Sequence, residues 1–309
     1  MRIYIISNND TNKITLLIKG IDYSKCVDCG DCVKVCDAKL YSLDKEKNQY
    51  IFDNPHNTCI KCGHCIAVCP SEAILFEHQD EAFNIDGANK IPKIVSYEDL
   101  MKILRMRRSI RVYKNEPVPE EKLVKIIEAM RYAPTASNRQ NWRITTVTNR
   151  KEIEYLSKES VKDLKLAKKV LPLRYLALPF LPSGLRKRAR DPRTKIILNR
   201  ELDLLAKGKD IVFFDAPCIL ILYSRSYTTY MAPNDAGVVM THGMLAAQAL
   251  GLGTCWIGIA QRAFQKKKLR KHLKIPKGYN VYGVMTIGIP DITYQRAPPK
   301  KAVRVTKMQ

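Results

Sequence analysis

The sequence predicts an α+β protein built from two modules, and three observations support this. The chain has 309 residues, more than one compact core usually holds, and 46% of them are hydrophobic, enough to bury a sizeable interior. The formal charge of +23 is divided unevenly, because residues 1–95 carry 11 basic and 13 acidic side chains whereas residues 96–309 carry 42 and 17. Eight of the ten cysteines lie between Cys26 and Cys69. We therefore expect a small cysteine-rich module followed by a larger, very basic one.

The first module is expected to span residues 1–80 and to begin with a β-hairpin, because the apolar runs Ile3–Ile6 and Ile14–Ile18 flank a polar turn at residues 8–12. The first run is too short for the core of an export signal. No stretch reaches the roughly 18–20 apolar residues that a membrane-spanning helix needs. We therefore expect no transmembrane segment and a cytoplasmic location, where cysteines ligate metals more often than they form disulfides.

Eight cysteines form two runs with the same spacing, C-x2-C-x2-C-x3-C, and adding 33 to each number of the first run gives the second. The first run is Cys26, Cys29, Cys32 and Cys36, and the second is Cys59, Cys62, Cys65 and Cys69. Three thiolates two residues apart can wrap a loop around one corner of an iron–sulfur cubane. The fourth lies on the short helix that follows and points to the other cluster.

This spacing predicts two [4Fe–4S] clusters, one held by Cys26, Cys29, Cys32 and Cys69 and the other by Cys59, Cys62, Cys65 and Cys36. Zinc is the main alternative. It usually takes two C-x2-C pairs separated by a longer loop, so the third cysteine in both runs argues against it. Gly30 and Gly63 follow the second cysteine of each run, where the backbone must approach a sulfide closely.

The segment from about Cys26 to Ala73 resembles a bacterial two-cluster ferredoxin. The second run ends Cys69-Pro70, as the family's runs do, whereas the first ends Cys36-Asp37. Proline shapes the exit of the loop and removes an amide donor. Asp37 stands in place of this proline in the first run, and we expect the change to affect the reduction potential of the cluster there. The four cysteine ligands are unaffected.

A polar linker without cysteines is expected at residues 81–97, followed by a second module at residues 98–309. Apolar residues at helical spacing predict one helix around residues 100–104 and another, entered through Pro119, around residues 123–130. The remaining elements expected here are the strands Arg143–Thr148 and Pro217–Tyr223 and the helix Asp235–Leu250.

Three segments of the second module favour a ligand that carries a phosphate. Arg107-Arg108-Ser109-Ile110-Arg111 ends the first helix, and guanidinium groups beside a hydroxyl suit phosphate oxygens. Alone, such a run more often complements the helix dipole. Residues 134–142, P-T-A-S-N-R-Q-N-W, form a small polar loop between a helix and a strand. Residues 251–258, G-L-G-T-C-W-I-G, are expected to form a glycine-rich loop whose backbone amides face a flat ligand.

In this order the three segments resemble the FMN-dependent nitroreductase family, and the resemblance spans Leu100 to the C-terminal end. It implies a sheet flanked by helices, bound FMN, and a homodimer with FMN at the subunit interface. Arg107 and Ser109 would grip the phosphate or ribityl chain, and Arg111 would lie near the N1/O2 edge of the ring. Asn141 stands where many members have proline. The FMN-binding residues implied are Arg107, Arg108, Ser109, Arg111, Pro134, Thr135, Ala136, Asn138, Gln140, Trp256, Ile257, Gly258 and one of Lys300 and Lys301.

The combination of the two modules predicts an oxidoreductase. Iron–sulfur clusters pass single electrons, whereas a flavin collects them and delivers two. We expect electrons from reduced ferredoxin or NAD(P)H to pass through the clusters to FMN and to reduce a nitroaromatic, quinone or activated alkene. No side chain is predicted to act as an obligatory acid or base. An FMN-dependent dehydrogenase, a reductive dehalogenase and an electron carrier without its own substrate stay open as alternatives.

The positive charge alone would favour a nucleic-acid partner. The sequence has no recognition helix and no stacking-aromatic motif, so we expect none. Part of the basic excess offsets the negative charge of the clusters and the FMN phosphate. The larger part, in residues 151–210 and from Arg262 to Lys274, is expected to face an acidic redox partner. Residues 151–210 are either a solvated loop and helix face or a lid or docking surface.

Overall fold

The computed structural model describes residues 16–77, 79, 82–90, 94–162, 186, 190–225 and 230–308. Its described residues form two units. The first unit contains the residues up to Val95 together with Pro134–Gln140, and the second contains Ser96–Ala133 and the residues from Asn141 onward. A short loop is therefore assigned to the first unit although the residues on both sides of it belong to the second.

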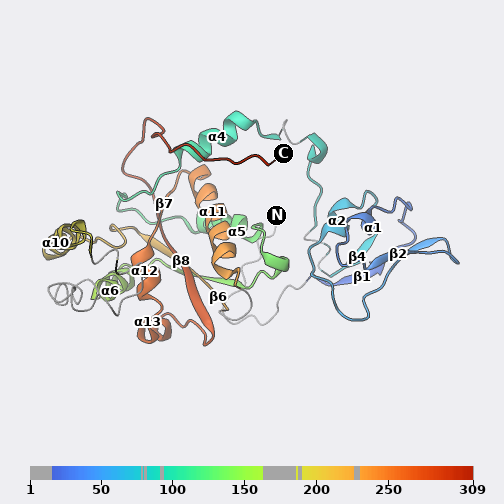
Figure 1. Cartoon of the computed structure of the whole chain (residues 1–309), viewed down its shortest axis with the longest axis horizontal. Helices are drawn as coiled ribbons and strands as arrows, with labels where there is room; N and C mark the ends of the chain where they lie inside the picture. The colour runs from blue at the N-terminus through green and yellow to red at the C-terminus, as the bar shows by residue number, and fades with distance from the viewer. Residues whose placement is uncertain are drawn as a thin grey trace. The chain divides into compact units, whose positions relative to one another are not determined.

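The first unit is built from two-stranded sheets and two short helices (Figure 1). β1 pairs with β4 and β2 pairs with β3, both antiparallel. The elements are β1 (Ile18–Ile21), α1 (Asp31–Val35), β2 (Tyr41–Asp44), β3 (Gln49–Phe52), α2 (His64–Val68), β4 (Ile74–Phe76), η2 (Ala88–Lys90) and η3 (Ala136–Asn138). Ile18 and Tyr41 are buried at the centre of a core that the cysteines surround. The predicted strand Ile3–Ile6 lies outside the described residues, and Ile18 opens β1, whose partner is β4.

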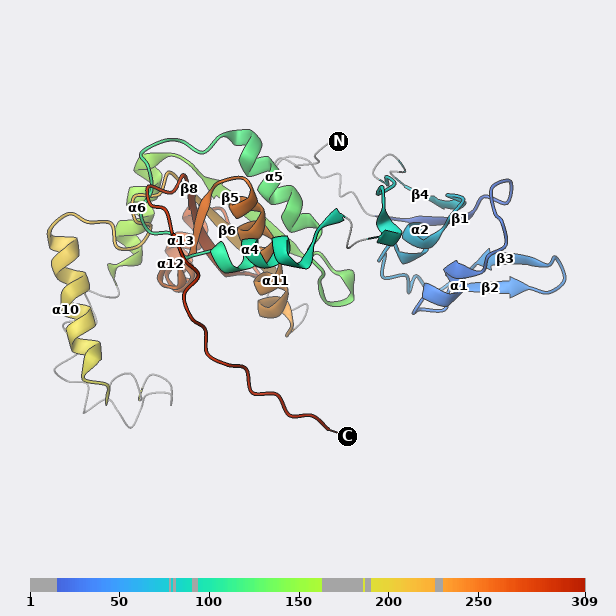
Figure 2. The same ribbon diagram turned by 90° about the horizontal axis from the view of Figure 1, so that it is seen from above.

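The second unit contains a four-stranded antiparallel sheet with helices on both faces (Figures 1 and 2). The strand order is β5-β6-β8-β7. The elements are α4 (Tyr97–Met106), α5 (Glu120–Arg131), β5 (Trp142–Val147), α6 (Arg150–Ser160), α10 (Arg193–Ala206), β6 (Cys218–Arg225), α11 (Ala232–Ala249), β7 (Gly253–Trp256), α12 (Gly258–Ala263), α13 (Lys267–His272) and β8 (Tyr279–Gly288).

The strand β6 lies inside the sheet and is buried on both faces. Leu220 and Leu222 pack into a core with α5 and α11. Ile219 and Ile221 point the other way, into a core with α6, α12 and α13. Alternate side chains of a strand point to opposite faces, so a run of apolar residues without polar breaks is what a central strand with two covered faces requires.

The apolar face predicted for the first helix of this unit is not buried. Ser96 caps α4, because its hydroxyl accepts a hydrogen bond of 3.0 Å from the Asp99 amide. None of the ten α4 residues is buried, and Leu100 and Leu104 are 44% and 41% exposed. The spacing of apolar residues predicts the helix correctly, but the apolar face of α4 is not covered by other described parts of the chain.

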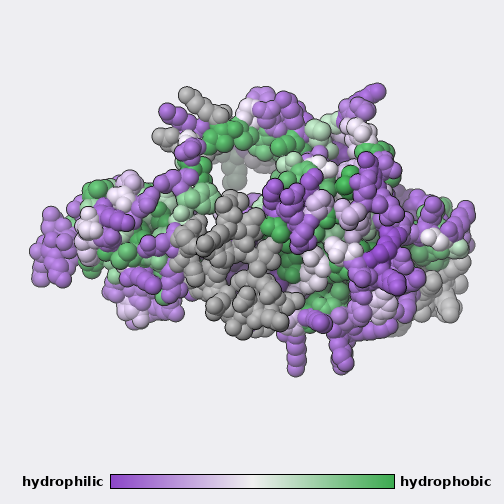
Figure 3. Space-filling view, turned by 180° about the vertical axis from the view of Figure 1, so that it is seen from behind, coloured by the Kyte–Doolittle hydropathy of each residue, from purple (hydrophilic) through white to green (hydrophobic). Residues whose placement is uncertain are grey.

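Hydrophilic side chains, in purple, cover much of the face shown in Figure 3, with hydrophobic ones between them. No helix in the described part of the chain has the length and hydrophobicity needed to span a membrane. Within residues 151–210, the part that is described contains most of α6 and α10, and residues 163–185 lie outside it.

Candidate cluster and flavin sites

The two cysteine runs fold in the same way, residue for residue. Gly30 precedes α1 and Gly63 precedes α2, and both are left-handed, with φ of 68° and 75°. Only a glycine takes this conformation without strain. Each helix has five residues and ends at the fourth cysteine of its run, in extended backbone. The duplication seen in the sequence is thus also a duplication of backbone geometry.

The fourth cysteine of each run accepts a backbone hydrogen bond from the residue four positions later. The amide of Leu40 donates to the Cys36 Sγ at 3.4 Å, and the amide of Ala73 donates to the Cys69 Sγ at 3.2 Å. Amide donors that point at sulfur favour the thiolate form, which is the form that ligates iron. All ten cysteines of the chain are free thiols.

The first predicted ligand set lines one pocket. Cys26, Cys29 and Cys32 from the first run and Cys69 from the second surround about 330 Å³ of empty space, together with Tyr50. The crossing of one cysteine from the other run is the arrangement that the spacing predicts. The described residues contain no group of three His, Cys, Asp or Glu side chains that could hold a single metal ion.

Near the second predicted set, a buried polar atom has no partner among the protein's described residues. The Tyr41 hydroxyl lies beside the Cys65 thiol and makes no hydrogen bond, although Tyr41 is only 4% exposed. Burial first, and then the neighbouring thiol, raises the pKa of Tyr41, so the hydroxyl remains a proton donor. A buried donor without an acceptor is costly. The sulfur atoms of a cluster would satisfy it, so the residues fit the group.

In the second unit, the arginine-rich segment runs along the edge strand β7. Ser109 forms a parallel bridge with Thr254, and the amide of Ile110 donates to the Thr254 carbonyl at 2.9 Å. Gly253 makes this approach feasible, because a β-carbon there would lie 2.6 Å from the Ile110 Cγ1. The predicted glycine-rich loop is therefore a turn at Gly251, a strand and the start of α12. The glycine serves close packing of the arginine-rich segment.

The side chains of this segment place cationic groups beside β7. The guanidinium carbon of Arg111 lies 5.6 Å from the ring centroid of Phe214, a residue that belongs to none of the sequence motifs. Arg111 and Ser109 also face the Cys255 thiol, and burial raises the pKa of that thiol more than Arg111 lowers it. Cys255 is thus a neutral, packed side chain.

Arg108 shows that this segment suits an anion. Its Nη2 donates to the Arg105 carbonyl, whereas its Nε is buried and has no partner. An unpaired guanidinium N–H inside a protein calls for an acceptor, and phosphate oxygens match the guanidinium fork. The residues present therefore fit the phosphate of a nucleotide such as FMN.

The loop Pro134–Gln140 belongs to the first unit and is tightly tied. The amide of Gln140 donates to the Thr135 hydroxyl at 3.1 Å, and the Gln140 side chain donates to the Asn138 Oδ1 at 2.9 Å. The Asn138 Nδ2 donates to the carbonyls of Lys61, at 2.6 Å, and Ile60, at 3.4 Å. The side chain of Asn138, one of the implied FMN-binding residues, is thus bonded to the backbone of the second cysteine run.

The remaining predicted residues lie in two places of the second unit. Trp256 ends β7 and donates through its indole to Gln261 at 2.8 Å, Ile257 donates its amide to the Val284 carbonyl at 2.7 Å, and Gly258 opens α12. Lys300 and Lys301 are exposed in the segment that follows β8. Figure 2 shows this segment extending away from the sheet of its own unit.

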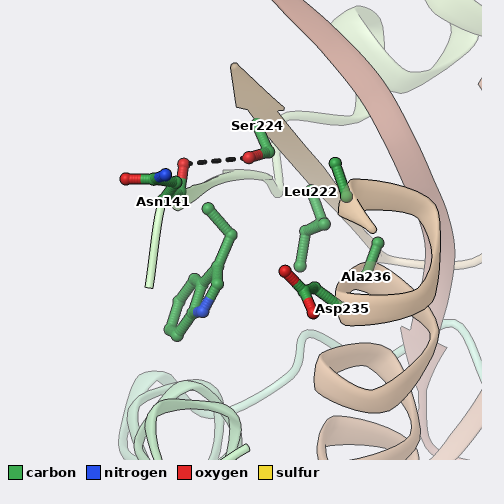
Figure 4. A pocket seen from close by; sticks show the side chains of 7 residues that line it. Asn141, Leu222, Ser224, Asp235 and Ala236 are labelled. Carbon is green, nitrogen blue, oxygen red and sulfur yellow. Dashed lines mark hydrogen bonds between the residues drawn. The ribbon is translucent and has the colours of Figure 1, made fainter. Parts of the chain in front are cut away.

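A small pocket of about 280 Å³ lies where β5 and β6 meet the start of α11 (Figure 4). The Ser224 hydroxyl donates to the Asn141 carbonyl at 3.1 Å on one side, and Asp235 and Ala236 of α11 form the other side. The indole nitrogen of Trp142, which also lines the pocket, is buried without a partner. The sequence marks Trp142 as part of a motif but does not reveal the pocket.

Comparisons with known proteins match both parts of the chain. The model of the nitroreductase family matches residues 104–289, and that of the 4Fe-4S dicluster domain matches residues 25–74. A nitrobenzene nitroreductase of Ectopseudomonas oleovorans is 29% identical over 226 residues, 67% of this chain and 92% of the relative. An NADH dehydrogenase of Thermus thermophilus is 56% identical over 41 residues, 13% of this chain and 20% of the relative. A nitroreductase of Bacteroides fragilis with bound FMN is 21% identical, with a TM-score of 0.49, over 68% of this chain and 99% of that one.

Proposed function

Because the chain belongs to the nitroreductase family and carries a 4Fe-4S dicluster domain ahead of the family's segment, we propose that it passes electrons through two [4Fe–4S] clusters to FMN and on to an organic acceptor. The observation that carries the proposal is the repeated cysteine geometry, in which both runs share glycine caps, helices and N–H···S bonds. A flavoprotein without iron–sulfur clusters would not require this repeated cysteine geometry.

The protein's own residues have distinct tasks in this proposal. Cys26, Cys29, Cys32 and Cys69 would hold one cluster and Cys36, Cys59, Cys65 and Cys62 the other. Arg107, Arg108 and Ser109 bind the phosphate end of FMN, and Arg111 offsets negative charge on the ring. Bound FMN supplies a ring that takes up electrons singly and delivers them in pairs. β7 holds the arginine segment in register through the Thr254 carbonyl.

The acceptor in this proposal is a nitroaromatic, a quinone or an activated alkene. The named activity of the Ectopseudomonas relative, nitrobenzene reduction, supports the first class. The donor is a reduced ferredoxin or NAD(P)H. The formal charge of +23 supports an acidic protein donor, because opposite charges steer such partners together. We also propose a cytoplasmic location, where the cysteine thiols would stay reduced until the clusters are inserted.

We further propose a homodimer. The exposed apolar side chains of α4, Leu100 and Leu104, and Val303 in the segment after β8, which is 84% exposed, support it. Leu100 and Leu104 lie on the same short helix, and exposed apolar side chains that cluster in this way favour an interface. Sedimentation of the FMN-loaded protein should show twice the chain mass, and a monomer at micromolar concentration would contradict the dimer.

The decisive experiment is anaerobic purification followed by measurement of iron, sulfide and flavin. Two cubanes require about eight irons per chain. The variant Cys29→Ser should lose about half of the iron and keep FMN, whereas Cys218→Ala, outside both runs, should keep both. Arg111→Ala should lose FMN and keep the iron. Wild-type protein with markedly less iron, or without bindable FMN, would refute the proposal.

A further inference from the structure

We infer that the Tyr41 hydroxyl donates a hydrogen bond to the Cys65 sulfur once that cysteine ligates iron, and that this bond raises the reduction potential of the second cluster. The second cluster is the one proposed on Cys36, Cys59, Cys62 and Cys65, and the first is the one on the other four cysteines of the two runs. The inference rests on the proposed function, because it needs both clusters. It makes two clusters with the same ligand spacing unequal in potential.

The burial of the Tyr41 hydroxyl carries the inference. Tyr41 is 4% exposed, and its hydroxyl oxygen is buried without a hydrogen-bond partner among the described residues. The thiol of Cys65, itself a buried residue, lies beside this oxygen. Buried polar groups in folded proteins nearly always have a partner, because an unsatisfied one destabilises the fold. An acceptor is therefore expected at this place in the loaded protein.

The ring of Tyr41 is packed so that its hydroxyl stays beside Cys65. Tyr41 opens β2 and pairs with Phe52 of β3, and the centroids of the two rings lie 5.0 Å apart. Tyr41 and Cys65 both belong to the buried core of the first unit. Side chains packed in a protein interior have little freedom to change rotamer. The hydroxyl is therefore held near the sulfur by the core itself.

Iron ligation changes what the Cys65 sulfur can accept. A neutral thiol is a weak acceptor, whereas a thiolate carries negative charge and accepts a stronger hydrogen bond. Iron binds the thiolate. Reduction adds one electron to the cluster and makes its sulfur atoms more negative, so an O–H donor stabilises the reduced cluster more than the oxidised one. The phenol keeps its proton, so the step transfers one electron and no proton.

The duplication provides a comparison within the same chain. The repeat distance of 33 residues pairs Leu40 with Ala73 and Tyr41 with Ile74. The backbone part of the pattern is repeated, because the amides of Leu40 and Ala73 each donate to the fourth cysteine of their own run, at 3.4 Å and 3.2 Å. Ile74 is buried and lines the pocket of the first ligand set, but its side chain has no donor. The phenol is therefore present on one side of the duplication only.

The first ligand set has a weaker counterpart in Ser71. The Ser71 Oγ lies 3.8 Å from the Cys69 Sγ, and either atom can be the donor. The equivalent position in the first run is Ala38. Ser71 is only partly buried, and a long contact near solvent is weaker than one enclosed in the core. We therefore expect Ser71 to shift the potential of the first cluster less than Tyr41 shifts that of the second.

The test is a redox titration of the fully loaded enzyme, followed by electron paramagnetic resonance, with Tyr41→Phe as the variant. This change keeps the ring and removes only the hydroxyl. The ratio of reduced to oxidised second cluster should fall about tenfold, the order of one hydrogen bond to a charged group, which lowers one midpoint potential by about 59 mV. The other potential should stay. Tyr23→Phe, at an exposed tyrosine of the same unit, is the matched control and should leave both unchanged.

Two further variants assign the shifted potential. Cys29→Ser removes a ligand of the first cluster only, so the signal that survives in it belongs to the second cluster. This surviving signal should be the one that Tyr41→Phe lowers. Ser71→Ala should lower the other potential, and by a smaller amount.

Electron–nuclear double resonance in D2O supplies a readout of the bond itself. The wild-type enzyme should show an exchangeable deuteron coupled to the second cluster that Tyr41→Phe lacks and Tyr23→Phe retains. A tyrosine that only fills space in the core would not contribute such a deuteron.

Unchanged potentials in Tyr41→Phe, an equal fall of both potentials, or an unaltered deuteron spectrum would overturn the inference. The proposed function fails separately, through missing iron or FMN in the wild-type protein. An enzyme with two intact clusters and FMN whose potentials do not respond to Tyr41→Phe would refute only the role of the tyrosine.

Discussion

Replacing Gly30 by alanine is expected to damage the protein much more than the same change at Gly63, although the two glycines occupy equivalent positions. Both are left-handed. A β-carbon at Gly30 would lie 2.6 Å from the Tyr50 Oη and 3.0 Å from its Cζ, whereas at Gly63 the nearest atom is the Leu16 Cδ2 at 3.6 Å. The first approach is a clash and the second is ordinary van der Waals contact.

The magnitudes follow from these distances. A side chain in the left-handed region costs about 1–2 kcal/mol in both variants. The clash adds about 1–3 kcal/mol at Gly30 alone, because the half-buried Tyr50 ring must move. Tyr50 lines the pocket of Cys26, Cys29, Cys32 and Cys69, so the movement disturbs the first cluster. We expect Gly30→Ala to lose that cluster in denaturant up to about a hundredfold faster than Gly63→Ala.

The assay follows the loss of cluster absorption in denaturant under anaerobic conditions, together with the electron paramagnetic resonance of the cluster that survives. Tyr50→Phe removes the oxygen at 2.6 Å, so it should restore part of the stability of Gly30→Ala and none of that of Gly63→Ala. Equal rates in the two alanine variants, or rescue of both by Tyr50→Phe, would refute the reasoning.

Two further predictions concern the second unit. Gly253→Ala should weaken FMN binding at least about tenfold in a fluorescence titration, because the new methyl group pushes Ile110 and the arginine segment off β7. Gly251→Ala, whose β-carbon would meet nothing within 4 Å, should bind FMN like the wild type and lose only stability, and equal affinities of the two variants would contradict this. Hydrogen bonds from two lysines lower the pKa of Glu159 below the usual 4.5, so the carboxylate stabilises the fold above pH 4.5 and this contribution is lost as the pH falls through the lowered value. Glu159→Gln should therefore lower the unfolding temperature slightly at neutral pH. The loss in free energy of unfolding should be less than about 1 kcal/mol, because the lysines are exposed. The difference in unfolding temperature between variant and wild type should disappear in acid, and a difference that grows in acid would contradict this prediction.

The dicluster domain and the nitroreductase-family domain could be predicted because their signals are local, whereas the assignment of cysteines to each cluster stays a prediction. Thiolate spacing within a run is set by the loop that wraps a cubane, so the dicluster prediction needed no tertiary information and is confirmed by the family match to residues 25–74. The order of three motifs was enough to predict the family of the second module, and the match of the nitroreductase family to residues 104–289 confirms it. The predicted helix after Pro119 is α5, and the predicted strand Pro217–Tyr223 is β6 shifted by one or two residues.

The errors concern contacts between segments far apart in sequence. The glycines near residue 253 suggested an open loop, but Gly253 lies in a strand because Ile110 packs against its α-carbon. The apolar spacing of α4 suggested a core-facing helix, and the structure leaves Leu100 largely exposed. Periodicity records which side of a helix is apolar, and only the tertiary structure shows what covers it. The individual FMN-binding residues stay predictions.

Two redox modules gain a kinetic advantage from sharing one chain. Two separate proteins would have to meet for every electron, whereas tethered partners find each other at a high effective concentration. A tether alone does not select a cluster, because the two runs are alike in backbone and ligand spacing. The bonds of Asn138 to Lys61 and Ile60 break that symmetry at one of the runs.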